Sequence, residues 1–228
     1  MNLDEVIKHI SDFVNHYKNE LYNLTQNESK ALELAGTIAV CEHYKYLGYS
    51  IEIVNPDKAK NVFCVKTSTR GFPWNFSHIK ILKENINYEI HTNLSVKSCH
   101  DDGVYCVDIG IIKEDSILKD EKKWKCVENS NLLSFGEVKK LVIYPMLLAQ
   151  FIGIVHEIRP EYLAMEIKPE GIFEPVLISL GNFSGNSTTI VKAYEKRKIK
   201  LFIAQDFDIR LANYRGKNVQ TPFYGNDF

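Results

Sequence analysis

Three charged side chains stand inside two apolar segments of this 228-residue chain. Asp108 interrupts the apolar run at residues 104–112, and Glu137 and Lys139 interrupt a second run at residues 132–141. A buried charge costs free energy unless it is paired or bound to a metal ion. Two carboxylates that converge repel each other, and a hard divalent cation such as Mg²⁺ relieves the repulsion. An ammonium group beside such a cation can orient or help activate a water, or stabilise charge on a phosphate.

Two strands are expected to position these side chains. Both runs are rich in β-branched and aromatic residues and are bounded by polar segments, which is typical of short strands. Because side chains alternate along a strand, Glu137 and Lys139 point to one face and Lys140 points to the other. If the two strands are neighbours in a sheet, Asp108 lies beside Glu137. The alternative is a pair of edge strands whose charges are solvated.

This arrangement resembles the PD-(D/E)xK nuclease superfamily, which has the restriction-endonuclease-like fold. In that family an Asp ends or bends one strand, and a Glu-x-Lys motif lies on the next. The matching residues here are Asp108 and Glu137-Val138-Lys139, and Val107 stands where the family often has Pro. The order of strand, turn, strand with Asp, insert and strand with Glu-x-Lys is also similar. The resemblance covers roughly residues 29–205.

The resemblance implies a metal-dependent nuclease that hydrolyses phosphodiester bonds in nucleic acid, with DNA as the expected substrate. Asp108, Glu137 and the backbone carbonyl of Val138 would hold Mg²⁺ or Mn²⁺. Lys139 would position the attacking water, and Lys140, on the opposite face, would take no part. A homodimer or a larger nuclease or defence complex is compatible with this interpretation.

The resembling family often adds a Glu from the helix before the first strand. Glu33 and Glu42 are the candidates, and a spacing of nine residues leaves them about 180° apart around a helix axis. Only one of them can therefore face the site. Glu33 is followed by the small residues Ala35 and Gly36, which allow close approach to a sheet. We expect Glu33 to be the fourth catalytic residue, against the alternative that it is a solvated helix charge.

Other functions remain open at this stage. The net charge of −1 provides no overall basic field, so a nucleic acid would have to be held by a local patch or by metal. One alternative is a non-catalytic nucleic-acid-binding or assembly subunit that keeps the nuclease fold and relies on a partner. Another is a hydrolase of small phosphoesters. The presence of Asp, Glu and Lys together favours an active enzyme.

The pattern along the chain predicts one α/β domain with a restriction-endonuclease-like central mixed β-sheet flanked by helices. Residues 1–28 would form an N-terminal helix, residues 29–205 the core, and residues 206–228 a tail. Hydrophobic periodicity favours helices at residues 3–22, 29–47, 145–158 and 187–198. Strands are expected at residues 49–54, 62–66, 87–96, 104–112, 132–141, 175–180 and 199–204, and residues 77–84 fit a strand or a short helix.

Two further segments are candidates for contact with nucleic acid. The charged insert at residues 113–131 contains four lysines, but its mixed charge is more typical of a solvated excursion. The loop at residues 68–76 carries Arg70 and Trp74, which could grip a phosphate or stack on a base. Anchoring of the aromatic residues on the core is the favoured interpretation of this loop.

Cysteine usage and hydropathy predict where the protein works. The five cysteines lack CxxC spacing, and the N-terminus does not resemble a secretory signal, which favours reduced thiols in the cytoplasm. No apolar run approaches the ~20 residues that span a bilayer, so we expect no membrane partner. Cys99, His100 and Cys106 lack the paired spacing of a zinc site, and core or loop positions are expected for these thiols.

Overall fold

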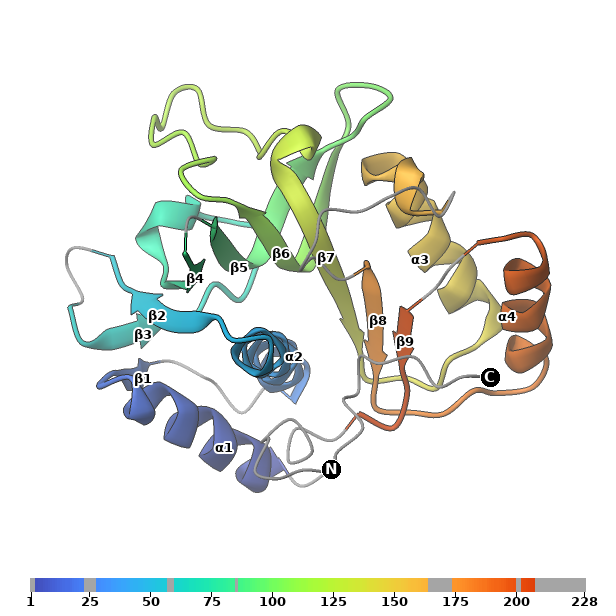
Figure 1. Ribbon diagram of the computed structural model, residues 1–228, viewed down its shortest axis with the longest axis horizontal. Helices are drawn as coiled ribbons and strands as arrows, with labels where there is room; N and C mark the ends of the chain where they lie inside the picture. The colour runs from blue at the N-terminus through green and yellow to red at the C-terminus, as the bar shows by residue number, and fades with distance from the viewer. Residues whose placement is uncertain are drawn as a thin grey trace.

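The computed structural model describes residues 3–22, 28–56, 60–84, 86–163, 174–199 and 202–207. They form a mixed α/β structure around a mostly antiparallel sheet (Figure 1). The seven strands lie in the spatial order β2 (Ser50–Val54), β4 (His78–Lys83), β5 (Ile86–Lys97), β6 (Val104–Lys113), β7 (Leu132–Lys139), β8 (Val176–Ser179) and β9 (Phe202–Ala204). Neighbours from β2 to β7 are antiparallel, whereas β8 and β9 run parallel to β7.

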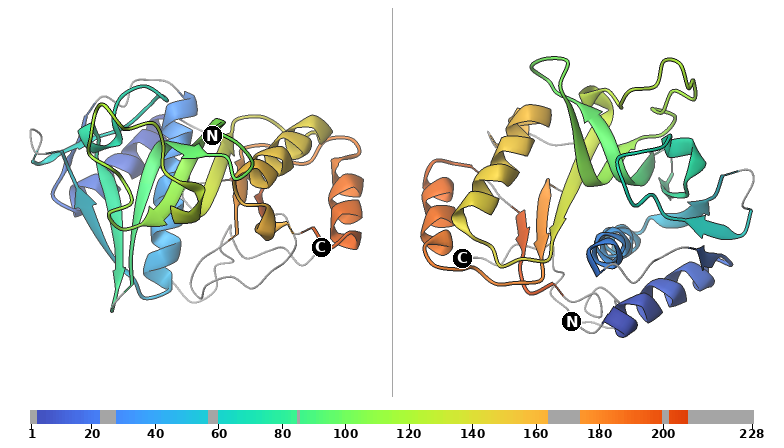
Figure 2. Two further views of the ribbon diagram at one scale, coloured as in Figure 1. Left: turned by 90° about the horizontal axis from the view of Figure 1, so that it is seen from above. Right: turned by 180° about the vertical axis from the view of Figure 1, so that it is seen from behind.

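Helices cover both faces of this sheet. The bounds of the four helices are α1 (Leu3–His16), α2 (Glu28–Tyr46), α3 (Pro145–Ile158) and α4 (Ser187–Lys196). Helices α1 and α2 lie on one side of the sheet, and α3 and α4 lie on the other, as Figure 1 and the right-hand view of Figure 2 show. The buried side chains accordingly form a first core, which includes α1 and α2, and a second core, which includes α3 and α4.

Helix α2 is buried around its whole circumference because it lies between α1 and the sheet. Every residue from Ala31 to Cys41 is buried. Gly36 brings the helix against the two strands that carry the acidic residues: a Cβ atom here would lie 3.1 Å from Val138 Cγ2 and 3.3 Å from Ile109 Cδ1. The expectation that small residues let this helix approach the sheet closely is confirmed.

The two strands with the charged residues are neighbours inside the sheet. Strand β6 pairs with β7, with Ile109 opposite Gly136, and β7 in turn pairs with β8. The alternative of two solvated edge strands is therefore wrong. Helix α3 begins at Pro145, as the sequence predicts, because proline suits the first turn of a helix.

The structure corrects the first predicted helix and decides one open alternative. The first helix ends at His16 rather than near residue 22, because Lys18 takes a left-handed conformation with a φ of 59°. The chain then forms β1 (Glu20–Tyr22), which pairs in parallel with β3 (Val62–Cys64) in a separate sheet. Residues 77–84 form strand β4 rather than a helix. The last strand, expected at residues 199–204, is β9 at Phe202–Ala204; residues 200 and 201 and the predicted tail after residue 207 lie outside the described residues.

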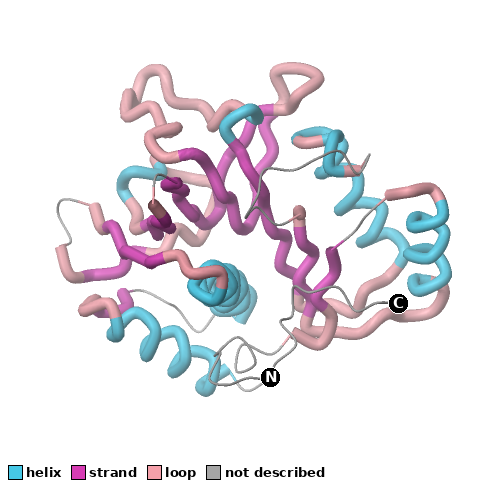
Figure 3. The backbone as a smooth tube through the Cα atoms, viewed as in Figure 1, coloured by secondary structure: helices cyan, strands magenta, loops and turns pink. Residues whose placement is uncertain are grey.

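The insert between β6 and β7 is more than a solvated excursion. Its Val127 is buried and bridges to Val96 of β5, and its Trp124 packs edge-on against Trp74 at 5.7 Å. Strand β5 was expected to be half-buried, but residues 89–94 are all buried. Figure 3 shows the insert as a loop that ends in one helical turn, η2 (Asn129–Asn131), before β7.

Candidate active site

The side chains of Asp108, Glu137 and Lys139 converge at one point between β6 and β7. Lys139 Nζ donates a hydrogen bond to Asp108 Oδ2 at 3.0 Å and another to Glu137 Oε2 at 2.8 Å. The backbone N–H of Val138 also donates to Asp108 Oδ2, at 2.8 Å. The convergence expected from the sequence is therefore present.

Asp108 occupies a place where the sheet is irregular. Val107 and Ile109 would share a face in a regular strand, yet Val107 packs in the second core and Ile109 in the first. On β5, Asn93 lies between the paired positions Thr92 and Leu94 and has a φ of 48°, a left-handed conformation that is uncommon for residues other than glycine. The twist of β6 at this point turns the carboxylate of Asp108 toward the backbone of β7.

The backbone of Val138 faces the same point. Its N–H reaches Asp108, and the N–H and C=O of one strand residue point to the same side. The Val138 carbonyl therefore also points toward β6. Val138 lies just past the end of the β6–β7 pairing, which is formed by Ile109 and Gly136. The side chain of Val138 packs in the first core, so only backbone atoms of this residue reach the site.

Strand alternation separates the two lysines, as predicted. Lys139 lines a groove on the side of α3, together with Glu137. Lys140 is 54% exposed and forms an ion pair with Glu28 at the start of α2, on the other face of the sheet.

Burial strongly affects the charges at the site. The Glu137 side chain is only 6% exposed, and this burial, together with repulsion from Asp108, raises its pKa to about 7 despite the nearby Lys139. Glu137 Oε1 is buried and accepts no hydrogen bond from the described residues. Burial disfavours the charged form of Lys139, but the two carboxylates outweigh this effect and raise its pKa.

These groups fit a hard divalent cation. The carboxylates of Asp108 and Glu137 converge, and the positively charged ammonium of Lys139 bridges them. Glu137 Oε1 offers a further buried acceptor, and the Val138 carbonyl points to the same place. Oxygen-only ligands of this kind are those that Mg²⁺ and Mn²⁺ prefer.

Glu33 lies next to the site rather than in it. Its carboxylate pairs with Lys30 at 2.7 Å and accepts a hydrogen bond from Asn93 Nδ2 at 3.0 Å. Asn93 lies on β5 between Thr92 and Leu94, whose partners on β6 are Ile109 and Val107, so Glu33 is held beside the segment of β6 that carries Asp108. Among the described residues, no hydrogen bond or ion pair joins Glu33 directly to Asp108, Glu137 or Lys139.

Glu42 takes a different position on the same helix. It pairs with Lys45 at 3.0 Å, and both residues lie near Tyr17, which follows α1: burial raises the pKa of Tyr17, Lys45 lowers it and Glu42 raises it. The predicted opposition of Glu33 and Glu42 around the helix is therefore consistent with their separate neighbours.

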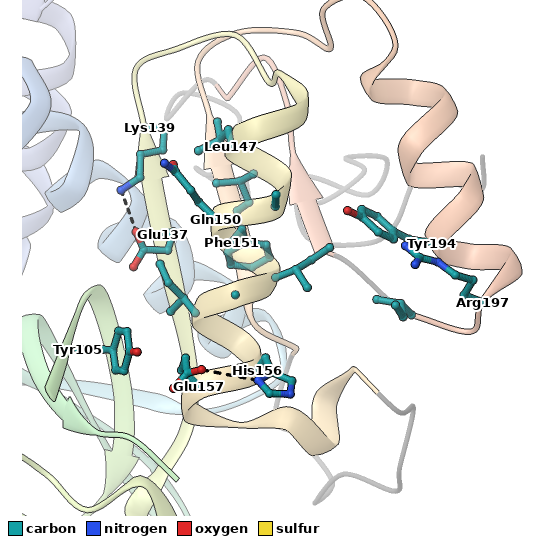
Figure 4. A pocket seen from close by; sticks show the side chains of 16 residues that line it. Tyr105, Glu137, Lys139, Leu147, Gln150, Phe151, His156, Glu157, Tyr194 and Arg197 are labelled. Atoms are coloured by element: carbon teal, nitrogen blue, oxygen red, sulfur yellow. Dashed lines mark hydrogen bonds and ion pairs between the residues drawn. The ribbon is translucent and has the colours of Figure 1, made fainter. Parts of the chain in front are cut away.

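The groove beside the site has a volume of about 850 Å³ and runs along α3 (Figure 4). Tyr105, Gln150 and Glu157 share its lining with Glu137 and Lys139. Sequence reasoning treated α3 only as a buried helix and missed Gln150. An exposed amide within the apolar segment at residues 146–155 was the available signal.

The described residues contain no helix with the length and hydropathy needed to cross a membrane. Comparison of the chain with models of protein families, with curated proteins and with solved structures found no significant match in any of the three.

Proposed function

We propose that this chain is a metal-dependent nuclease with a restriction-endonuclease-like fold, hydrolysing phosphodiester bonds in nucleic acid, with DNA as the expected substrate. The observation that carries the proposal is the convergence of Asp108, Glu137 and Lys139 at the twist of β6. The order of β5, a turn, β6 with Asp108, the insert and β7 with Glu137 and Lys139, followed by helix α3, also matches the order on which the resemblance is based.

Each site residue has a distinct role in this proposal. Asp108 and Glu137, with the carbonyl of Val138, would hold Mg²⁺ or Mn²⁺. The bound ion would polarise the phosphate and lower the pKa of a coordinated water. Lys139 would move off the carboxylates to orient the attacking water or to stabilise charge on the phosphate. The hydrogen bond from the Val138 N–H would keep Asp108 in place during this movement of Lys139.

The charge around the site favours help from a partner. Lys139 and Arg197 are the Lys and Arg side chains among the described residues that line the groove. The exposed lysines of the insert come before Leu132, where β7 begins. Lys139 lies at the other end of β7, roughly 20 Å farther along the strand. Because few cations line the groove, a partner would have to bring the nucleic acid to the site. A second candidate function is therefore a nucleic-acid-binding or assembly subunit that has the fold without the activity.

Supercoiled plasmid tests the proposal directly. The purified protein should nick it with Mg²⁺ or Mn²⁺ and should leave it intact in EDTA. Glu137→Gln, purified in parallel, should show no nicking, which excludes a contaminating nuclease. If neither DNA nor RNA is cut under any metal condition while either one is bound, the non-catalytic subunit is the better description.

We expect Glu33→Gln to lower cleavage by about 10–100-fold, the usual effect of a change just outside the ligands of a metal site. The amide keeps the shape of the side chain but weakens its contacts with Lys30 and Asn93. Glu42→Gln is the matched control, because Glu42 also pairs with a lysine three residues away on α2. Rates should be compared at equal folded fraction.

The control defines the alternatives for this helix. A loss of activity in Glu42→Gln alone would place the site on the other side of α2. Full activity in both variants would leave Asp108, Glu137 and Lys139 as the whole catalytic group.

A further inference from the structure

A second group of side chains converges away from the candidate active site, on β4 and β5. His78, Glu89 and His91 each place one ligand atom within 4.8 Å of the others. His91 Nε2 lies 3.0 Å from Glu89 Oε2, and His78 Nε2 lies 3.9 Å from Glu89 Oε1. The two imidazole rings are stacked, with centroids 4.7 Å apart.

The sheet holds these three residues rigidly. The β4–β5 register pairs Ile79 with Ile90 and Lys80 with Glu89, which places His78 beside His91. Glu89 and His91 are two residues apart on β5 and so share a face. Ile79 and Ile90 point the opposite way, into the first core. The ligand atoms therefore come from paired strands rather than from flexible loops.

The group is largely shielded from solvent but borders a cavity. The side chains of His78, Glu89 and His91 are 16%, 8% and 5% exposed. All three line a cavity of about 250 Å³, together with Trp74 and Asp115. This space gives a small molecule, such as water, access to the point where the three side chains meet.

A hydrogen-bonded Glu–His pair explains only part of this geometry. Such a pair accounts for Glu89 and His91, but the 3.9 Å distance leaves His78 beyond hydrogen-bonding range of Glu89. A metal ion at the centre would use all three ligands. Lys80 and Lys119 also line this cavity, but Lys80 pairs with Glu114, and Asp115 adds a carboxylate to the same lining.

We propose that His78, Glu89 and His91 bind a divalent transition-metal ion, with Zn²⁺ preferred. Two imidazole nitrogens and one carboxylate oxygen form a donor set that Zn²⁺ uses, and it leaves a fourth position for water. The fourth position faces the cavity of about 250 Å³. This site does not depend on the proposed nuclease function, since its nitrogen ligands differ from the oxygen-only ligands at Asp108 and Glu137.

Titration of the metal-free full chain with Zn²⁺, and separately with Co²⁺, tests the site. We expect one equivalent of Zn²⁺ to bind in the presence of millimolar Mg²⁺, and bound Co²⁺ to show visible absorption bands typical of nitrogen and oxygen ligands. His78→Ala should weaken Zn²⁺ binding by more than the roughly 10–100-fold typical of an outer-shell change. His78 is the most exposed of the three, so this variant is the least disruptive to the fold.

Two controls separate this site from others. The exposed group of His100, His156 and Glu157 has the same residue types, so the double variant His100→Ala/His156→Ala removes two histidines without touching the proposed ligands. Zn²⁺ affinity should be unchanged in this variant and in Glu137→Gln. If Glu137→Gln loses Mg²⁺ binding but keeps Zn²⁺ binding, the two metal sites are separate, which supports the proposed Zn²⁺ site.

The opposite results would overturn the proposal. It fails if the wild-type protein binds neither Zn²⁺ nor Co²⁺. It also fails if binding is lost in His100→Ala/His156→Ala and retained in His78→Ala. If His78→Ala does not fold, as judged by circular dichroism, Glu89→Gln serves in its place, because the amide preserves the size of the side chain while removing the anionic ligand.

Discussion

Lys139→Ala should lower nucleic-acid cleavage by about 10²–10⁴-fold, the range expected for loss of a group that acts on the water or on the transition-state charge. Metal binding should survive, because an ammonium group is not a metal ligand. It should even become tighter, since Lys139 Nζ bridges Asp108 and Glu137 at the proposed metal position. Cleavage rates and Mg²⁺ titrations on the same preparation measure the two effects separately.

Lys140→Ala is the natural control for this experiment. It removes the same charge one residue away, but Lys140 pairs with Glu28 on the other face of the sheet. Its cleavage rate should stay close to that of the wild type. An inactive Lys140→Ala beside an active Lys139→Ala would contradict the proposal that the groove side of β7 carries the chemistry.

Glu137→Gln should stabilise the metal-free protein at pH 8 and remove part of its pH dependence. Burial, followed by repulsion from Asp108, raises the pKa of Glu137 from 4.5 to about 7. Between these values the folded protein keeps a proton that the unfolded chain has released, so stability falls as pH rises through this range. The loss attributable to Glu137 is about 3 kcal/mol, and it is nearly complete at pH 8.

Urea unfolding in EDTA, from pH 5 to pH 8, measures this effect. The difference in unfolding free energy between the variant and the wild type isolates Glu137, because the remaining groups titrate in both proteins. The difference should be smallest near pH 5 and should grow in favour of the variant toward pH 8. A difference that does not change with pH would show that Glu137 is not protonated at neutral pH in the metal-free fold.

Metal should remove most of the stability difference between the wild type and Glu137→Gln. Binding to the folded state alone stabilises it by about 2–3 kcal/mol at a hundredfold excess over Kd. The wild type should therefore gain this amount from Mg²⁺ or Mn²⁺ at pH 8, whereas Glu137→Gln lacks the second carboxylate and should gain little. If millimolar Mg²⁺ or Mn²⁺ does not raise the melting temperature of the wild type, that result would count against the proposed metal site.

The sequence by itself determined the local features around the candidate active site. Alternation along a strand put Glu137 and Lys139 on one face and Lys140 on the other, and the structure keeps this division. The helix expected at residues 29–47 is α2, which ends at Tyr46, and Gly48 follows it with a φ of 85°, a conformation that commonly ends helices. Side-chain alternation and helix termination depend on neighbouring residues, so the sequence pattern is enough to predict them.

Features that join distant segments were decided by the tertiary structure. The twist that turns Asp108 toward Val138 depends on Asn93 of β5 and on packing into two cores. The same pairing of strands gives Glu33 an amide partner on β5 instead of direct contact with the carboxylates.

The histidine group shows the same limit more clearly. Nothing in the spacing of His78, Glu89 and His91 suggested a ligand set, because residues 77–84 fitted a strand or a helix equally well. Only the register of β4 against β5 places His78 beside His91, and the insert from the far end of β6 helps to bury them. Strand register depends on contacts between segments that are far apart in the chain, and for that reason local sequence patterns did not predict this group.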